Sequence, residues 1–230
     1  MCFSAGASFG AGAILSIVGV AAIKQSHPVS QRVFAAIPLL FAVQQVSEGS
    51  VWLALLNPAH AFWLGPAMYF FLTFAYVLWP AWVPLSILLL EKNSFRRKIL
   101  YTGLGTGLAV SAYLGYRLLT EDIHAAINGM HIYYYMGPPV ALMHYFGVLY
   151  FASTVIPCFL STVKRMWLFG VSIAVSYFIT KLFFDDYELS VWCFFAAIMS
   201  AAVFSIILDL KKYFLNAISP GDAEKIRVSV

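Results

Sequence analysis

Charged residues are scarce in this chain. Asp, Glu, Lys and Arg together make up 10% of its 230 residues, whereas 62% of the residues are apolar. A soluble domain carries about 25% charged residues, and the mean hydropathy here is +0.84. This composition excludes a water-soluble fold. It predicts an integral membrane protein whose main partner is the lipid bilayer, with no nucleic-acid partner.

Cysteine is also scarce, with three residues in the whole chain. Three scattered thiols are too few for a disulfide framework. Cys2 and Cys193 are both expected on the outer side of the membrane, where they either form one bridge or stay unlinked. Cys158 is expected to act only as a small packing residue. Short metal-binding spacings such as H-x-x-x-H or C-x-x-C do not occur.

Seven long apolar runs fill most of the chain. A helix needs roughly 20 predominantly apolar residues to cross a bilayer core of about 30 Å. The runs predict an all-α fold, a seven-transmembrane-helix bundle in a single domain at residues 1–218, followed by a polar tail at residues 219–230. No basic residue precedes the first run, so we expect a retained helix rather than a cleaved signal peptide. We place the helices at residues 7–23, 33–56, 62–90, 99–119, 139–161, 166–184 and 188–210.

Basic residues are nearly absent from every second gap between these runs. Of the 14 Lys and Arg residues, twelve fall in one alternating set of gaps, and the other set holds only Arg117 and Lys181. Cytoplasmic segments retain Lys and Arg close to the ends of their spans. The pattern therefore predicts an external N-terminus, a cytoplasmic C-terminus and an external segment at residues 121–138, in a multi-pass protein of the cell membrane.

One acidic residue, Glu48, lies well inside the second run. Gln44 and Trp52 lie four residues to either side of it and Gln45 lies three before it, so all four share one helix face. An ionisable group inside a span costs at least ~2.5 to 3.5 kcal/mol on insertion scales and usually faces the bundle interior or a wet cavity. Two interpretations stay open. Glu48 is either a functional carboxyl group or a hydrogen-bonded contact that joins two helices.

Further candidate residues fall in the outer half of the later runs. His144 is the one histidine inside a span, which makes it a candidate ligand or proton carrier. The spacing E-x-S-V-W occurs twice, from Glu48 and from Glu188, either by chance or as inverted halves of the kind seen in transporters. The remaining candidates near the outer ends are Lys181, Asp185 and Trp192.

A divalent metal cofactor is one further hypothesis. Zinc or copper needs three or four converging nitrogen, sulfur or oxygen donors. The outer-side residues that could supply them are Cys2, Glu48, His144 and Glu188.

Several other residues suggest packing or anchoring. Pro80 and Pro84 predict kinks, because each lacks a backbone N–H donor. Arg117 is expected to reach the interface, to pair with the acidic residues at 185 and 186, or to clamp an anion. Four tryptophans close to predicted span ends are expected to anchor the protein at the membrane interface: Trp63, Trp79, Trp82 and Trp167.

The opening Met1-Cys2-Phe3-Ser4-Ala5, together with the Gln44 to Trp52 stripe, resembles a family of uncharacterised bacterial multi-pass membrane proteins. The resemblance implies a bacterial inner membrane location and brings no activity with it. Microbial rhodopsins do not fit, since the last run has no lysine before Lys211. Alkaline ceramidases and the progestin and adiponectin receptors resemble this chain only in topology, because the last run also lacks their histidines.

These observations predict a polar pocket around Glu48 that opens toward the outer face. The leading hypothesis is binding or translocation of a small solute, proton or metal ion. One alternative is an intramembrane hydrolase, possibly metal-dependent, in which a metal or the Glu48 and His144 pair activates water on a lipid-like substrate. Another is a structural or accessory subunit of a membrane complex, whose polar residues only join helices.

Overall fold

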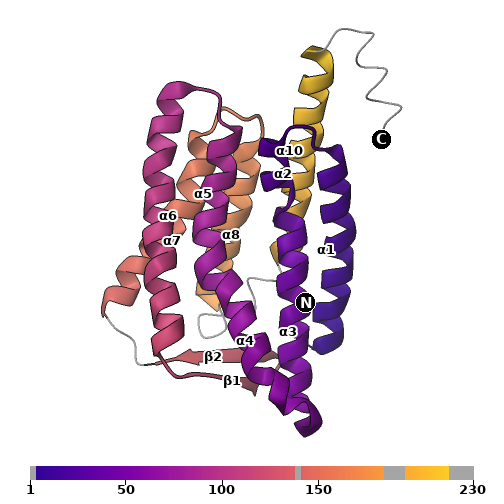
Figure 1. Cartoon of the computed structure of the whole chain (residues 1–230), viewed down its shortest axis with the longest axis vertical. Helices are drawn as coiled ribbons and strands as arrows, with labels where there is room; N and C mark the ends of the chain where they lie inside the picture. Colours follow the sequence, from indigo (N-terminus) through magenta and orange to yellow (C-terminus); the bar gives the residue numbers. More distant parts are fainter. Residues whose placement is uncertain (1–3, 138–140, 184–194, 218–230) are drawn as a thin grey trace.

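The structure, a computed structural model, describes residues 4–137, 141–183 and 195–217, without the side chains of residues 141–144 and 215–217. This part of the chain is mostly helical, with the long helices side by side (Figure 1). Its elements are α1 (Ala5–Gln25), α2 (Val29–Ala35), α3 (Ile37–Leu56), η1 (Pro58–Trp63), α4 (Leu64–Thr73), η2 (Phe74–Leu78), α5 (Trp79–Leu90), α6 (Ser94–Thr120), β1 (Ile123–Asn128), β2 (His131–Met136), α7 (Ala141–Leu160), α8 (Met166–Phe183) and α10 (Ala196–Ala217).

Four helical stretches within the described residues are long and apolar enough to cross a membrane. A shorter apolar stretch, Tyr145–Leu160, forms most of α7. The four correspond to the first, second, third and sixth of the predicted helices, which confirms a helical protein with several candidate spans. They are Ala5–Gln25, Val29–Leu56, Pro58–Leu90 and Met166–Phe183.

Two of the predicted helices are interrupted. The second begins earlier than expected and breaks at Ala36, just before Pro38 in the first turn of α3. The third begins with a 3₁₀ turn, η1, just before α4. Between α4 and α5 it contains a π turn, η2. Pro80 and Pro84 follow this π turn, and the missing proline N–H groups leave carbonyls one turn earlier without their usual donor. In Figure 1, α4 and α5 accordingly follow different directions.

The all-α prediction omitted a β-hairpin. Strands β1 and β2 pair antiparallel, with Ile123 opposite Met136 and Asn128 opposite His131. Gly129 takes the first position of the two-residue loop with a φ of +62°, a conformation that glycine adopts without strain. The Asn-Gly pair followed by a run of aromatic and β-branched residues is a hairpin signal.

The hairpin covers one end of the bundle and is fastened to α6 by Arg117. This side chain is only 3% exposed, forms a two-pronged ion pair with Glu121, and donates a hydrogen bond to the Met136 carbonyl at 3.2 Å. Beneath the hairpin, Tyr134 stacks on Phe71 of α4 with ring centroids 5.1 Å apart. Arg117 therefore holds the hairpin in place through Glu121 and the Met136 carbonyl.

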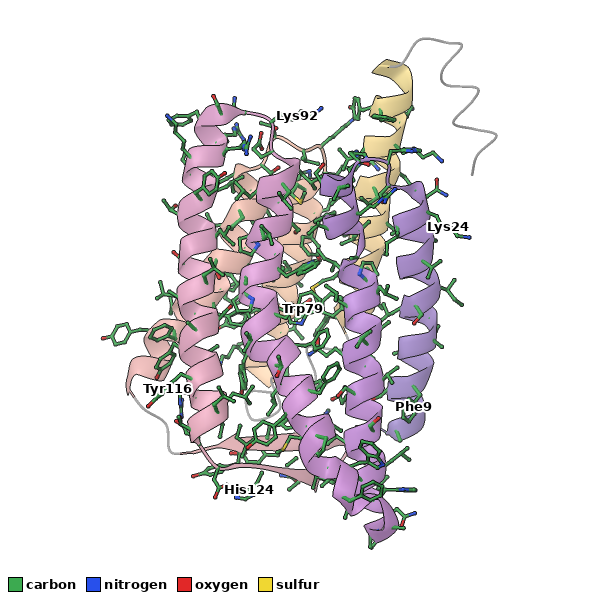
Figure 2. The ribbon with its side chains drawn as sticks, in the orientation of Figure 1. Phe9, Lys24, Trp79, Lys92, Tyr116 and His124 are labelled. Atoms are coloured by element: carbon green, nitrogen blue, oxygen red, sulfur yellow. The ribbon has the colours of Figure 1, made fainter. Side chains whose placement is uncertain are left out.

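The basic connections gather at the opposite end of the bundle. Lys24 and Lys92 lie there, whereas His124 on the hairpin lies at the other end (Figure 2). Arg96 donates to the Leu160 carbonyl at the end of α7, at 2.7 Å. The connections that we assigned to one side of the membrane thus share one end of the protein.

Candidate functional site

Helix α3 turns its polar stripe inward, as predicted. Glu48 is completely buried, with an exposed fraction of 0%, and Gln44, Gln45 and Trp52 are buried beside it. Trp52 also belongs to the apolar cluster under the hairpin, together with Met68 of α4. Glu48 therefore lies one helical turn deeper than that cluster, between the hairpin end and the middle of the bundle.

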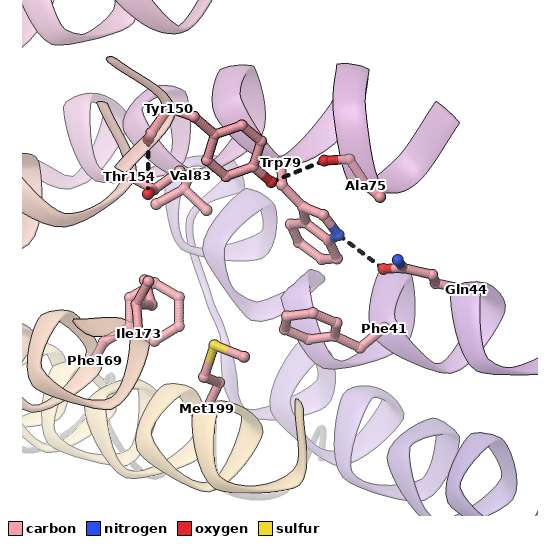
Figure 3. A pocket seen from close by; sticks show the side chains of 10 residues that line it. All are labelled: Phe41, Gln44, Ala75, Trp79, Val83, Tyr150, Thr154, Phe169, Ile173 and Met199. Atoms are coloured by element: carbon pink, nitrogen blue, oxygen red, sulfur yellow. Dashed lines mark hydrogen bonds between the residues drawn. The ribbon is translucent and has the colours of Figure 1, made fainter. Parts of the chain in front are cut away.

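Hydrogen bonds connect the stripe to its surroundings. The Gln45 Nε2 donates to Glu48 Oε2 at 3.5 Å, a long contact. The Trp79 Nε1 donates to Gln44 Oε1 at 2.8 Å and links α3 to α5 (Figure 3). Trp79 was predicted to be an interface anchor, and that prediction is wrong, because its indole is buried at mid-height (Figure 2).

Three buried polar atoms near this level have no hydrogen-bond partner among the described residues. They are Gln45 Oε1, Trp52 Nε1 and Ser8 Oγ. Ser8 belongs to the turn of α1 that packs on this part of α3, since a Cβ on Gly49 would meet the Phe9 ring at 2.9 Å. A buried polar group without a partner costs about 1 to 3 kcal/mol. The surroundings of Glu48 therefore keep hydrogen-bonding capacity for a solute or water.

A small cavity lies on the deeper side of this stripe. Its volume is about 40 Å³, which exceeds the roughly 10 to 15 Å³ that one water needs and is far below the roughly 150 Å³ that holds benzene. Gln44 and the stacked pair of Phe41 and Trp79, with ring centroids 4.2 Å apart, form one wall. The remaining lining residues shown in Figure 3 are Ala75, Val83, Tyr150, Thr154, Phe169, Ile173 and Met199.

Two carbonyls of the π turn η2 accept hydrogen bonds from hydroxyl groups of other helices, and one of them, Ala75, lines the cavity beside Trp79 (Figure 3). The Tyr150 hydroxyl donates to the Ala75 carbonyl at 2.8 Å, and the Ser111 hydroxyl donates to the Val77 carbonyl at 2.7 Å. Side chains from α7 and α6 thus hydrogen-bond two carbonyls of the π turn. Sequence reasoning missed Tyr150 and Ser111. The sequence signal was the pair of prolines in the third span, which marks the disturbed turn but not its hydrogen-bond partners.

Most of the other predicted site residues cannot be placed. His144 lies in the first turn of α7, and its side chain is outside the described residues. Lys181 is exposed in the last turn of α8. The common cavity of Glu48, His144 and Glu188 stays a prediction, and within the described ranges no three His, Cys, Asp or Glu side chains form a metal-binding group. The predicted site residues outside the described ranges are Cys2, Asp185, Glu188 and Trp192.

A second buried carboxylate, Glu91, lies at the basic end of the bundle and was not considered from the sequence. Glu91 Oε1 accepts from the Asn93 backbone N–H at 2.8 Å and from the Thr162 hydroxyl at 2.7 Å. Its Oε2 accepts from the Thr162 backbone N–H at 2.6 Å. Glu91 therefore joins the connection after α5 to the connection after α7. Burial alone would raise the pKa of Glu91, but the hydrogen bonds from Thr162, Asn93 and Ser161 outweigh burial and lower it.

The lowered pKa of Glu91 predicts acid sensitivity. A depressed carboxyl pKa stabilises the fold fully above its ordinary value of 4.5, and this stability is lost as the pH falls through the lowered value. Thr162→Val removes one charge-assisted hydrogen bond, which should cost about 1.5 to 3 kcal/mol at neutral pH. Thermal unfolding in detergent is measured from pH 7 to pH 3. The difference in unfolding temperature between wild type and variant should decrease as the pH falls, and a difference that does not depend on pH would contradict this role.

The sequence matches the model of a family of unknown function over residues 1–212. The chain belongs to this family, DUF6629. The match confirms the resemblance that the opening residues and the α3 stripe suggested. No curated protein and no solved structure matches the chain. The DUF6629 model includes Glu48, the cavity and Glu91, but it assigns no activity to them.

Proposed function

We propose that this DUF6629 protein spans the membrane seven times and binds or translocates a small polar solute, a proton or a metal ion in a pocket around Glu48. One observation carries the proposal: Glu48 is fully buried inside a stretch long and apolar enough to cross a membrane. A buried charge in a span is costly and usually marks a path for ions or protons. Among the candidate ligands, a proton or a small cation suits this carboxyl group best.

The polar atoms beside Glu48 support this choice. Gln45 Oε1 is an acceptor without a partner among the described residues, and so it offers a lone pair to a cation or to a protonated group. Trp52 Nε1 and Ser8 Oγ add a donor and a hydroxyl. We propose that these atoms and the carboxyl group together bind a hydrated cation or a proton carried on water.

The proposed orientation places the hairpin outside and the connection at residues 91–93 inside. The basic residues at one end of the bundle support it. Ser94 and Asn128 are both exposed, near the start of α6 and at the tip of the hairpin. In a background without native cysteines, we expect an impermeant thiol reagent to label Asn128→Cys but not Ser94→Cys in intact cells. Labelling of Ser94→Cys but not of Asn128→Cys would show the opposite orientation.

Purified protein in vesicles provides the functional test. Proton uptake is measured with an enclosed pH dye under an imposed proton gradient, and cation binding is measured by calorimetry in detergent with Zn²⁺ and Na⁺ as probes. We expect either protein-dependent proton uptake or a saturable cation isotherm. Uptake equal to that of protein-free vesicles, together with no isotherm for either cation, would reject the proposal.

A structural or accessory role is the second candidate, and the contacts of α3 favour it. The Trp79 bond to Gln44 joins α3 to α5 and is of the kind that links membrane helices without further function. In that case neither flux nor binding is expected from the isolated protein. Replacing Glu48 by glutamine would then leave every property unchanged.

A further inference from the structure

A second hollow lies on the other side of α3 from Glu48. Its volume is about 680 Å³, and it is bounded by α1, α3, η1 and α4. Its lining on α3 includes Val43, Val46, Ser47, Ser50 and Leu53, which recur every three or four residues. This face is distinct from the buried stripe that holds Glu48. We call this hollow the α3–α4 groove.

The long walls of the α3–α4 groove are apolar. Val43 and Val46 of α3 and Phe70 of α4 are exposed on them. Two of its serines donate their hydroxyl groups to backbone carbonyls: Ser47 to the Ala67 carbonyl at 2.8 Å and Ser50 to the Val46 carbonyl at 3.0 Å. Because these donors are already paired, the walls suit hydrocarbon better than water.

The polar character of the α3–α4 groove is concentrated at one end. His60 and Trp63 of η1 line that end, beside the turn where α3 stops, and Trp63 is 56% exposed. A tryptophan and a histidine at the end of a span lie at the depth of lipid headgroups and offer N–H donors to phosphate or ester oxygens. None of the lining residues in the described part of the chain is Asp or Glu. The groove therefore has apolar walls and one polar end, which match the acyl chains and headgroup of a lipid.

We propose that the α3–α4 groove binds one phospholipid, with an acyl chain along Val43, Val46 and Phe70 and the headgroup at His60 and Trp63. Both long walls belong to stretches able to cross a membrane, Val29–Leu56 and Pro58–Leu90, and hydrocarbon is the medium around such stretches. The concave groove contacts a chain from three helical segments, whereas an ordinary neighbouring lipid contacts a single convex surface. The inference rests on the membrane location and not on the chemistry of Glu48.

The test counts bound lipid by native mass spectrometry of the detergent-solubilised protein after titration with dioleoyl phosphatidylglycerol. We expect one lipid per chain to persist when all others are removed. Trp63→Ala should weaken this binding several-fold, whereas the matched control Trp167→Ala, on a tryptophan that is 53% exposed outside the groove, should leave it unchanged.

A second pair of variants fills space instead of removing contacts. Val43→Trp places an indole in the groove and should weaken lipid binding about tenfold or more, a loss of at least about 1.4 kcal/mol. Leu108→Trp on α6, also exposed but outside the groove, should bind as wild type does. Thermal unfolding of all four variants checks their folding. Equal lipid retention in Trp63→Ala and Trp167→Ala, the absence of a one-lipid species in wild type, or a dimer that covers the groove would each overturn the proposal.

Discussion

The Glu48→Gln variant is expected to fold as the wild type does and to lose proton or cation binding entirely. Glutamine keeps the shape of the side chain, and its Oε1 can still accept the hydrogen bond from Gln45. Interhelical polar contacts in membranes average only about 0.6 kcal/mol, so the unfolding temperature should change little. An amide neither titrates nor holds a cation as a carboxylate does, and binding should fall below detection. The measurements are thermal unfolding in detergent beside the flux and calorimetric assays.

Glu91→Gln is the matched control for this change. Glu91 is also a buried carboxyl group, but it lies at the basic end and already accepts hydrogen bonds from Asn93 and Thr162. Its replacement should lower the free energy of unfolding and leave binding by the folded protein intact. Glu48→Gln should therefore lose binding and keep its stability, whereas Glu91→Gln should lose stability and keep its binding. Normal binding by a well-folded Glu48→Gln protein would reject the proposed function and leave the structural role.

Gly107→Ala is expected to destabilise the protein severely. Helix α6 crosses α5 so closely at this point that a Cβ on Gly107 would lie 1.9 Å from the Pro80 carbonyl oxygen. That oxygen belongs to the backbone just after the π turn, so no flexible side chain can move aside. Overpacking typically costs 1 to 3 kcal/mol and occasionally more, and we expect at least about 3 kcal/mol here. The measurement is the midpoint of thermal unfolding in detergent.

Gly105→Ala serves as the control on the same helix. Apart from its own stretch of helix, no atom of the described residues lies within 4 Å of a Cβ at Gly105, and alanine is favoured over glycine in a helix by about 0.5 to 1 kcal/mol. This variant should be as stable as wild type or slightly more stable. Equal effects of the two substitutions would mean that α5 and α6 do not approach each other as described.

The inward position of the α3 stripe could be predicted from the sequence because it follows from local periodicity and solvation. Gln44, Gln45, Glu48 and Trp52 share a face at 3.6 residues per turn, and a carboxyl group in hydrocarbon is too costly to leave exposed. All four are indeed buried. Their partners could not be predicted, since the Trp79 bond to Gln44 joins residues 35 positions apart.

The π turn shows a different limit. Pro80 and Pro84 predicted a disturbance in the third helix, but not which side chains would hydrogen-bond the π turn. Tyr150 and Ser111 donate to its Ala75 and Val77 carbonyls, from helices that are remote in sequence. Their involvement depends on how the helices pack, which single-chain periodicity does not encode. The hairpin, by contrast, was predictable from Asn128 and Gly129.

Infrared difference spectroscopy of the carboxyl stretching bands tests most directly whether Glu48 is the binding group. Wild-type protein in vesicles is compared before and after a pH step or the addition of the bound cation, in parallel with Glu48→Gln. We predict that the wild type loses a protonated-carboxyl band or shifts a carboxylate band as the site fills, and that this change is missing from Glu48→Gln and retained in Glu91→Gln. The same spectral change in wild type and Glu48→Gln, or no carboxyl change in wild type, would contradict the account.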